Sequence, residues 1–341
     1  MKVLLVVGPE NENRFSMTNY TNICKKIYRE KGYDVSILRL KLINSKNKIL
    51  IFLARYLFVP IQLLGKEAEL IHLMDHSYGH SLLFTNKKCI TTIHDLIPLE
   101  FNFCRNQIKS IISKIIFSLI IKIIIKKSSN IIVVSKTTQN LLKNYFKISE
   151  RKLILAYNPP LNRKLEIFKD KKKDIDILLI GKNFYKNNIY AVKSCLNIKM
   201  KLNIIWINPD YNLVKLFKNS DHIVKTYCFL DDKYLFEIYH KSKIILNLSF
   251  SEGFGWLPFE ASKYNCCSIM SDIRIFRELH PSSVEFLQPL DNEILVSNFI
   301  KKVLNSKNLR NKLLNNIFSD YEKLKKTKYS LKNFLNNINC I

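Results

Sequence analysis

The sequence predicts an α/β protein built from two doubly wound domains, each with its own parallel sheet. Three observations predict this class. Short apolar runs alternate with longer helical patterns through both halves of the chain. These runs are continuously apolar rather than alternating, which is typical of parallel strands that are covered on both faces. A turn-like stretch at residues 157–160 and a charged run at residues 169–174 separate the two series.

The length and composition agree with two compact domains. The chain has 341 residues, of which 47% are hydrophobic, and it contains only 7 glycines and 9 prolines. This composition excludes a mainly disordered or collagen-like chain, because enough apolar surface is present to offset the entropy of ordering. We expect an N-terminal domain at residues 1–160, a linker at 161–174 and a C-terminal domain at 175–320. A final helix at 321–341 is expected to return to the N-terminal domain.

In the first half, the residue pattern predicts five strands with helices between them. The predicted strands are residues 3–7, 35–38, 70–74, 89–93 and 131–134. The predicted helices are residues 18–30, 50–64, 107–127 and 137–146.

The second half repeats this alternation. Its predicted strands are residues 175–180, 202–207, 223–227, 244–248, 268–270 and 284–287. The last fifty or so residues, from about Asn292, are predicted to be helical and are rich in lysine. In such sheets, ligands bind at the carboxyl ends of the strands, so two facing domains predict a site in the cleft between them.

The charge balance is strongly basic. Lys and Arg number 55 against 28 Asp and Glu, which gives a formal net charge of +27. Such a charge suits nucleic acid, an anionic membrane surface or anionic small molecules, and a compositional bias toward lysine can also produce it. Aromatic residues and cations do not interleave in a nucleic-acid-binding motif, so we expect no nucleic-acid partner.

The cysteines and apolar segments bear on the compartment. The eight cysteines form no C-x-x-C pair, which predicts reduced thiols in a cytoplasmic protein and no zinc site. The apolar segments at 49–64 and 111–125 are interrupted by charged residues, so no membrane-spanning helix is expected. The helix at 107–127 carries a polar stripe with Lys114, Lys122 and Lys126. It is either a core helix of the first sheet or an interfacial helix whose lysines reach the headgroups.

The segment with the clearest chemistry is residues 249–261, SFSEGFGWLPFEA, which follows a strand and opens a helix. Gly253 and Gly255 allow a ligand to approach the backbone closely near a helix N-terminus. Glu252 precedes the helix and Glu260 lies about one turn inside it, so the two carboxylates can hold separate hydroxyl groups of one ligand. The alternative is a helix cap with two surface glutamates.

Two further segments follow strands. Residues 91–98, TTIHDLIP, place His94 and Asp95 after a strand, either as loop-packing residues or as binding residues. Residues 71–80, IHLMDHSYGH, place Asp75 and His76 similarly, for a metal site, for an acceptor contact or for a structural loop.

The segment at residues 249–261 resembles the E-x7-E stretch of the family 4 glycosyltransferases, which are retaining enzymes of the GT-B fold. The match covers Glu252, Gly253, Phe254, Gly255 and Glu260, and residues 92–99 match the T-I-H-D-L-I-P-L string common in that family. The resemblance extends along nearly the whole chain and implies two Rossmann-like domains that face each other across a cleft.

By this resemblance, Glu252 contacts the donor sugar and Glu260 the ribose, while the backbone amides of residues 253–255 contact sugar and phosphate. His94 faces the donor sugar, and His94 and Glu252 form the catalytic pair. In the loop after the strand at 175–180, Lys186 and Lys182 are expected to bind the donor diphosphate, although the Arg usual in the family is missing.

The resemblance also implies the partners. The donor is a nucleotide-diphosphate sugar (GDP-mannose-like or a UDP-sugar), and the acceptor is a glycan or a lipid-linked precursor of a surface polysaccharide or lipopolysaccharide. Asp75, His76, Asp95 and Arg14 are expected to line the acceptor site or the cleft. No metal or other cofactor is expected, and the protein is expected in the cytoplasm, peripheral to the inner face of the plasma membrane. The alternatives are a GT-B protein that binds or hydrolyses nucleotide sugars and a basic nucleic-acid-binding protein.

Overall fold

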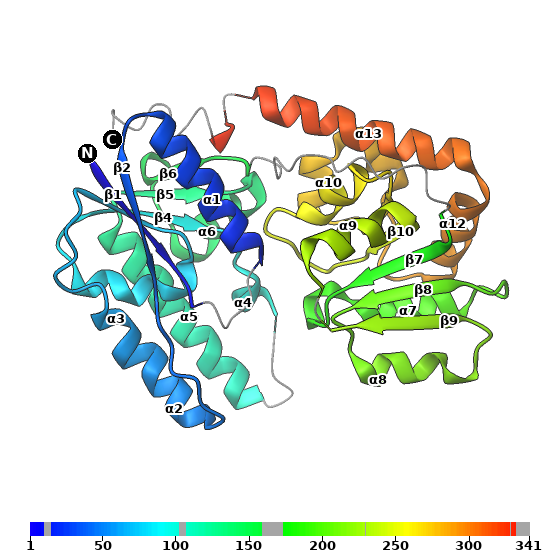
Figure 1. Ribbon diagram of the computed structural model, residues 1–341, viewed down its shortest axis with the longest axis horizontal. Helices are drawn as coiled ribbons and strands as arrows, with labels where there is room; N and C mark the ends of the chain where they lie inside the picture. Colours follow the sequence, from blue (N-terminus) through cyan, green and yellow to red (C-terminus); the bar gives the residue numbers. More distant parts are fainter. Residues whose placement is uncertain (10–14, 102–106, 159–172, 229, 328, 332–341) are drawn as a thin grey trace. The chain divides into compact units, whose positions relative to one another are not determined.

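The computed structural model describes residues 1–9, 15–101, 107–158, 173–228, 230–327 and 329–331. The chain divides into two compact units (Figure 1). Unit 1 comprises Met1–Pro159 and Thr327–Ile341, and unit 2 comprises Pro160–Lys326. Residues 161–172 of the expected linker lie outside the described residues, as do residues 332–341 of the expected final helix. Among the described residues, no helix combines the length and the apolar character that a membrane span requires.

Unit 1 is built on a sheet of six parallel strands in the order β2-β1-β3-β4-β5-β6. The strands are β1 (Lys2–Val7), β2 (Asp34–Arg39), β3 (Leu70–Leu73), β4 (Lys88–Ile93), β5 (Asn130–Val133) and β6 (Leu153–Leu155). The five predicted strands are confirmed to within one residue at each end. The sixth strand was not predicted because only three residues pair with β5, too few to give a pattern.

The helices of unit 1 follow the predicted alternation except at one place. They are α1 (Phe15–Glu30), α2 (Lys48–Leu53), α3 (Val59–Ile61), α4 (Ile97–Glu100), α5 (Gln107–Lys127) and α6 (Lys136–Phe146), with the 3₁₀ segment η3 (His76–Phe84). The helix predicted at residues 50–64 is confirmed as a helical segment from Lys48 to Ile61, but its middle part is the π-turn η2 (Ala54–Phe58) between α2 and α3. The Val59 N–H bonds to the Ala54 carbonyl five residues back, and Pro60 has no N–H for the following turn.

The C-terminal end of the chain belongs to unit 1. The Tyr157 N–H donates to the Tyr329 carbonyl at 2.7 Å, and the Leu331 N–H donates to the Tyr157 carbonyl at 3.1 Å. Leu331 is fully buried in the cluster formed by β1, α1 and the neighbouring strands. This cluster is therefore completed by residues more than 150 positions away from the rest of unit 1.

Unit 2 is built on a sheet of five parallel strands in the order β11-β10-β7-β8-β9. The strands are β7 (Ile175–Ile180), β8 (Asn203–Ile207), β9 (Ile223–Tyr227), β10 (Ser242–Asn247) and β11 (Cys267–Met270). A strand predicted at 284–287 is wrong, since Pro281 opens the 3₁₀ segment η7 (Pro281–Phe286) there. A single bridge, between Ser271 and Gln288, remains of the expected pairing.

Helices cover both faces of this second sheet. They are α7 (Asn188–Leu196), α8 (Tyr211–Val214), α9 (Asp232–Lys241), α10 (Trp256–Ser262), α11 (Arg274–Leu279), α12 (Glu293–Asn305) and α13 (Lys307–Lys326), with the 3₁₀ segments η5 (Phe184–Lys186) and η6 (Lys215–Asn219). Ile177 and Leu179 of β7 pack in a core with α7 and α12, while Leu178 packs in a second core with α9. The sheet is therefore buried on both sides, as the continuous apolar runs predicted.

Strand order fixes where a ligand can bind in each unit. The order reverses between β1 and β3 in the first sheet and between β7 and β10 in the second. At such a switch point the loops after the two strands leave in opposite directions, and the carboxyl ends of the strands border a crevice that binds ligands. The loops after β7 and β10 contain two of the segments that the sequence analysis selected.

Candidate active site

Two loops meet at the switch point of unit 2. The first follows β7 and runs from Gly181 to Asn187, and the second follows β10 and precedes α10. The Phe250 N–H donates to the Tyr185 carbonyl at 2.8 Å, which holds the two loops together. Because β7 and β10 are neighbours in a parallel sheet, residues 66 positions apart in sequence lie side by side here.

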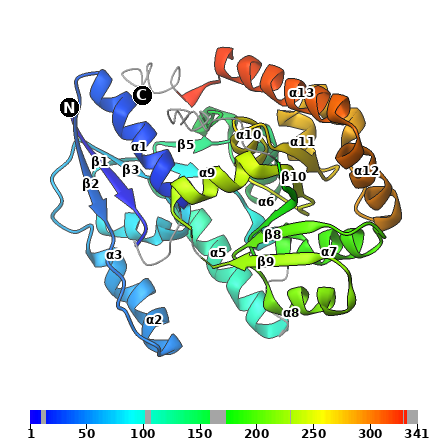
Figure 2. The same cartoon turned by 45° about the vertical axis from the view of Figure 1, so that its right-hand side comes forward.

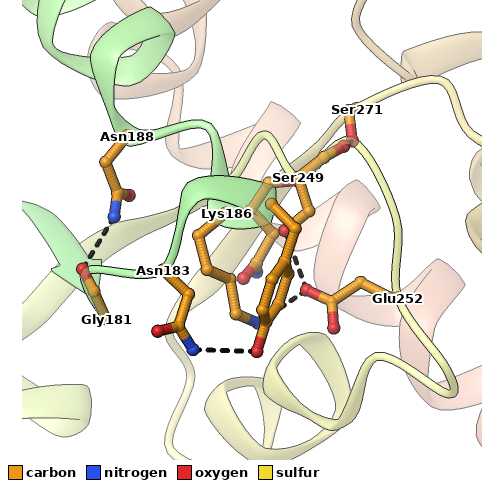
Figure 3. Close-up of polar contacts among 9 residues, drawn as sticks. Gly181, Asn183, Lys186, Asn188, Ser249, Glu252 and Ser271 are labelled. Carbon is orange, nitrogen blue, oxygen red and sulfur yellow. Dashed lines mark hydrogen bonds and ion pairs between the residues drawn. The ribbon is translucent and has the colours of Figure 1, made fainter. Parts of the chain in front are cut away.

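Lys186 and Glu252 form an ion pair across these loops (Figure 3). Lys186 Nζ lies 2.6 Å from Glu252 Oε1, and the two side chains are only 18% and 12% exposed. Ser249 Oγ donates to the same carboxylate oxygen at 2.8 Å. Since both of these contacts use Oε1, Oε2 is the atom through which this carboxylate can accept a further hydroxyl group.

The Lys186 loop is held by its first and last residues. Gly181 adopts a φ of +90°, which favours glycine. Its carbonyl accepts hydrogen bonds from Trp206 Nε1 at 3.0 Å and from Asn188 Nδ2 at 2.7 Å. Asn187 adopts a left-handed conformation and begins α7. Lys186 therefore sits on a short turn that is fixed at both ends.

The Glu252 loop is fixed by Ser271, which follows the neighbouring strand β11. Its Oγ donates to the Ser249 carbonyl at 2.6 Å, and its N–H donates to the Asn247 carbonyl at 3.0 Å. Ser271 is fully buried. Ser249, which bonds to Glu252, is thus held in place by a residue that follows the next strand of the sheet.

The glycines of this segment allow close packing. Gly255, the N-cap of α10, has a φ of +71°, and a Cβ placed there would lie 2.7 Å from Phe276 Cε1.

Glu260 lies on α10, about one turn from its start, and Tyr239 of α9 donates to its Oε2 at 3.4 Å. Burial, followed by the charge of Glu260, raises the pKa of Tyr239, so its hydroxyl group stays protonated.

Lys182 lies apart from the ion pair. Its side chain is exposed, and within the described part of the chain it has no ion pair. The structure therefore brings Lys186 to Glu252 without Lys182, although both lysines lie on the same loop.

In unit 1, the residues selected after β3 and β4 lie together. His94 Nε2 is 3.0 Å from the Met74 carbonyl, and the His94 N–H donates to His76 Nδ1 at 3.4 Å. Because a carbonyl only accepts, His94 Nε2 carries the proton and Nδ1 of the neutral ring is an acceptor.

Asp75 accepts from the Ser77 N–H at 2.9 Å and caps η3. The described contact of Asp95 is similar, since its Oδ1 accepts from the Ile97 N–H at 3.2 Å.

The loop after β1 packs against the same place. A Cβ at Gly8 would lie 2.9 Å from Tyr78 Cε2 and 3.1 Å from Asp75 Oδ2, so only glycine fits without displacing η3. Arg14, which we expected to contribute to this site, lies outside the described residues. Among the residues that are described, no group of three His, Cys, Asp or Glu side chains could hold a metal ion.

A buried polar network beneath His94 was not predicted from the sequence. His72 on β3 bonds to the Tyr28 hydroxyl at 3.0 Å and to Thr92 Oγ1 at 2.9 Å, and Thr92 bonds in turn to the Tyr20 hydroxyl at 3.0 Å. The Tyr20 ring also meets the His94 ring edge to face, with centroids 4.8 Å apart. The sequence contained one signal of this network, which is His72 inside an otherwise apolar strand. A buried polar side chain needs hydrogen-bond partners, so its position indicates that such partners are present.

We expect His94 to remain neutral throughout the physiological pH range. Burial, followed by the nearby His76, lowers the pKa of His94 from its usual 6.5 to about 4. The ring nitrogen resonances in an NMR titration should therefore stay constant from about pH 8 down to about pH 5. A midpoint between about pH 6 and 7 would contradict the burial of this ring.

Comparison with known proteins adds to this geometry. Residues 19–159 match the family model described as Glycosyltransferase Family 4. The chain is also 27% identical, over 237 residues, to the O-antigen chain mannosyltransferase RfbU of Salmonella typhimurium. That alignment covers 62% of this chain and 63% of RfbU, so the chain matches less than two thirds of the relative.

Solved structures show the fold of the whole chain. Sucrose-phosphate synthase from Thermosynechococcus elongatus superposes with a TM-score of 0.73 and 15% identity, over 100% of this chain and 98% of the synthase. Anabaena Alr3699/HepE, solved in complex with UDP and glucose, superposes with a TM-score of 0.67 and 9% identity over the full length of both chains. The chain thus has the GT-B fold, and its residues 19–159 match the model of glycosyltransferase family 4.

Proposed function

We propose that the protein is a retaining glycosyltransferase that moves a sugar from a nucleotide-diphosphate sugar to a hydroxyl group of a glycan or lipid-linked acceptor. The observation that carries the proposal is the Lys186–Glu252 pair at the switch point of unit 2, in a chain with a family 4 region. The similarity to an O-antigen chain mannosyltransferase supports a role in surface polysaccharide synthesis and favours a mannose donor.

In the proposed reaction, Lys186 stabilises the charge that develops on the departing diphosphate. A cation fixed beside the leaving group stabilises the transition state more than the ground state, because the charge on the leaving oxygen grows as the bond breaks. Lysine acts here as a point charge, without the paired donors of an arginine. Its partner Glu252 keeps the ammonium group in place before the donor binds.

Glu252 is proposed to orient the donor sugar. Ser249 bonds to Oε1 independently of Lys186, so the carboxylate keeps one partner when the lysine turns to the diphosphate. Oε2 then accepts a sugar hydroxyl group. Glu260, one turn inside α10, is proposed to bind the ribose, and the backbone amides of Gly253, Phe254 and Gly255 are proposed to bind sugar and phosphate.

Unit 1 is proposed to supply His94 and the acceptor site. The neutral His94 ring presents Nδ1 as an acceptor for a hydroxyl group of the reacting sugar, since Nε2 is committed to the Met74 carbonyl. Asp75, His76 and Asp95 lie beside it and are proposed as acceptor-site residues. We propose that the reaction needs no metal ion and takes place in the cytoplasm, at the inner face of the plasma membrane.

Labelled donors test this proposal. The purified protein should transfer label from one of a panel of nucleotide-diphosphate sugars, GDP-mannose included, to a lipid extract or a glycan acceptor. Glu252→Gln keeps the shape of the side chain and removes its charge, and it should reduce transfer about 100-fold. Release of free sugar alone would instead identify a nucleotide-sugar hydrolase. Failure of every donor to bind in a thermal-shift assay would overturn the proposal.

A further inference from the structure

Large apolar side chains are exposed together on two helical segments of unit 1. One segment is α2, η2 and α3, and the other is residues 111–119 of α5. Six of these side chains are each more than half exposed and define what we call the apolar face: Ile49, Leu57, Phe58, Ile111, Ile115 and Leu119. Soluble proteins rarely expose so many large apolar side chains together without a partner.

The two segments belong to one surface because both pack on η3. Arg55 of η2 stacks on the Tyr78 ring of η3, with its guanidinium carbon 4.5 Å from the ring centroid. On the other side, a Cβ at Gly79 would clash with Ile124 of α5, so α5 lies directly on η3. In both Figure 1 and Figure 2, α2, α3 and α5 lie at the same end of unit 1.

The apolar face is not needed for the core of unit 1. Helix α5 already buries Phe117, Ile121 and Ile124 on its inner side. On its outer side, Ile111, Ile115 and Leu119 follow one another every four residues, and therefore point the same way. The sequence analysis left two alternatives for this helix, a core helix and an interfacial helix with lysines. One side of α5 packs in the core as in the first alternative, and the opposite side exposes the apolar residues and lysines that the second alternative is based on.

Cations continue the outer line of α5. Lys122 and Lys126 are exposed and follow Leu119 at spacings of three and four residues, so Lys122 lies about 4.5 Å further along the helix axis than Leu119. With Tyr145 and Lys147 they line a hollow of about 320 Å³.

The sequence has no Asp or Glu between Glu100 and Glu150, nor between Asp34 and Glu67. Both helical segments are therefore free of acidic residues.

We propose that the apolar face inserts into the surface of an anionic lipid bilayer, with Lys122, Lys126 and Lys147 at the level of the headgroup phosphates. Apolar side chains beside a cationic rim fit the boundary between acyl chains and anionic headgroups. A second copy of this chain fits less well, because it would bring two proteins of charge +27 together. The proposal rests on this surface alone and does not depend on the proposed transfer reaction.

Vesicle sedimentation tests the apolar face. The full chain should bind vesicles of phosphatidylcholine with phosphatidylglycerol and bind pure phosphatidylcholine vesicles far less. The double variant Ile49→Ser and Leu57→Ser should lower the partition coefficient at least about tenfold. The matched control, Ile294→Ser with Leu295→Ser, changes two exposed apolar residues of unit 2 and should bind like the wild type. Equal losses in both variants, or none in either, would overturn the proposal.

A second pair of variants tests the cations. Lys122→Gln with Lys126→Gln should weaken binding to anionic vesicles about tenfold or more and flatten its salt dependence, since each lysine near the surface contributes about fivefold. Lys199→Gln with Lys201→Gln removes the same net charge from exposed positions in unit 2 and should have a much smaller effect. A dimer in analytical ultracentrifugation that the Ile49→Ser, Leu57→Ser variant abolishes would assign the face to a second copy and overturn the bilayer proposal.

Discussion

Replacing Lys186 with alanine should reduce kcat/KM for sugar transfer about 100- to 1000-fold, the usual cost of removing one fixed group that stabilises developing charge. The lysine is held at 2.6 Å from Glu252 and is only 18% exposed, so neither water nor a mobile neighbour replaces it easily. Lys186→Met should be nearly as damaging, because it keeps the length of the side chain and removes only the charge.

Two other lysines make this prediction specific. Lys199→Ala, at an exposed position away from the switch point, should leave kcat/KM unchanged and controls for the loss of net charge. Lys182→Ala measures whether the second lysine of the loop contributes, as the sequence resemblance implies. Wild-type kcat/KM in Lys186→Ala, with an unchanged unfolding temperature, would show that the diphosphate is bound elsewhere.

The Lys186–Glu252 pair shows what the sequence could and could not predict. Glu252 was selected because its segment follows a predicted strand and opens a helix, and Lys186 because its loop resembles the diphosphate-binding loop of family 4 glycosyltransferases. Both loops follow predicted strands, and parallel strands bring such loops to one edge of the sheet. The contact itself could not be predicted, because it requires β7 and β10 to be neighbours. Strand order depends on packing between distant segments, and 66 residues separate this pair.

The network around His72 was missed for a related reason. The run Leu70–Leu73 reads as an apolar strand, and one histidine in it does not alter the periodicity. Its partners, Tyr28 and Thr92, come from α1 and β4, and only the folded unit shows that they meet it. Burial lowers the pKa of His72 to about 3, so this ring is neutral and bonds through both nitrogens.

The errors in secondary structure have local causes. A strand was expected at residues 284–287, where the apolar pattern is real but Pro281 favours a 3₁₀ turn. The helix predicted at 50–64 is helical from Lys48 to Ile61, but it contains the π-turn η2 just before Pro60, which cannot donate a backbone hydrogen bond. Both departures from the prediction lie next to a proline.

Trp206 connects the core of unit 2 to the proposed donor site. The residue lies on β8, is fully buried, and belongs to the cluster formed by β7, α7 and α12. Its Nε1 donates to the Gly181 carbonyl at 3.0 Å, the same carbonyl that Asn188 holds from the other side. The turn that carries Lys186 therefore depends on a core side chain as well as on its own backbone.

Trp206→Ala should lower the free energy of unfolding by about 3–5 kcal/mol, because it leaves a large cavity in a packed core. Trp206→Phe keeps most of the apolar volume and removes the hydrogen bond to Gly181, so it should cost less, and Asn188→Ala should cost about 0.5–1.5 kcal/mol. Denaturant unfolding measures these differences. The double variant Trp206→Phe with Asn188→Ala leaves the Gly181 carbonyl without either of these side-chain donors, and its effect should exceed the sum of the two single changes. Strict additivity would mean that the two donors do not hold the Lys186 turn jointly.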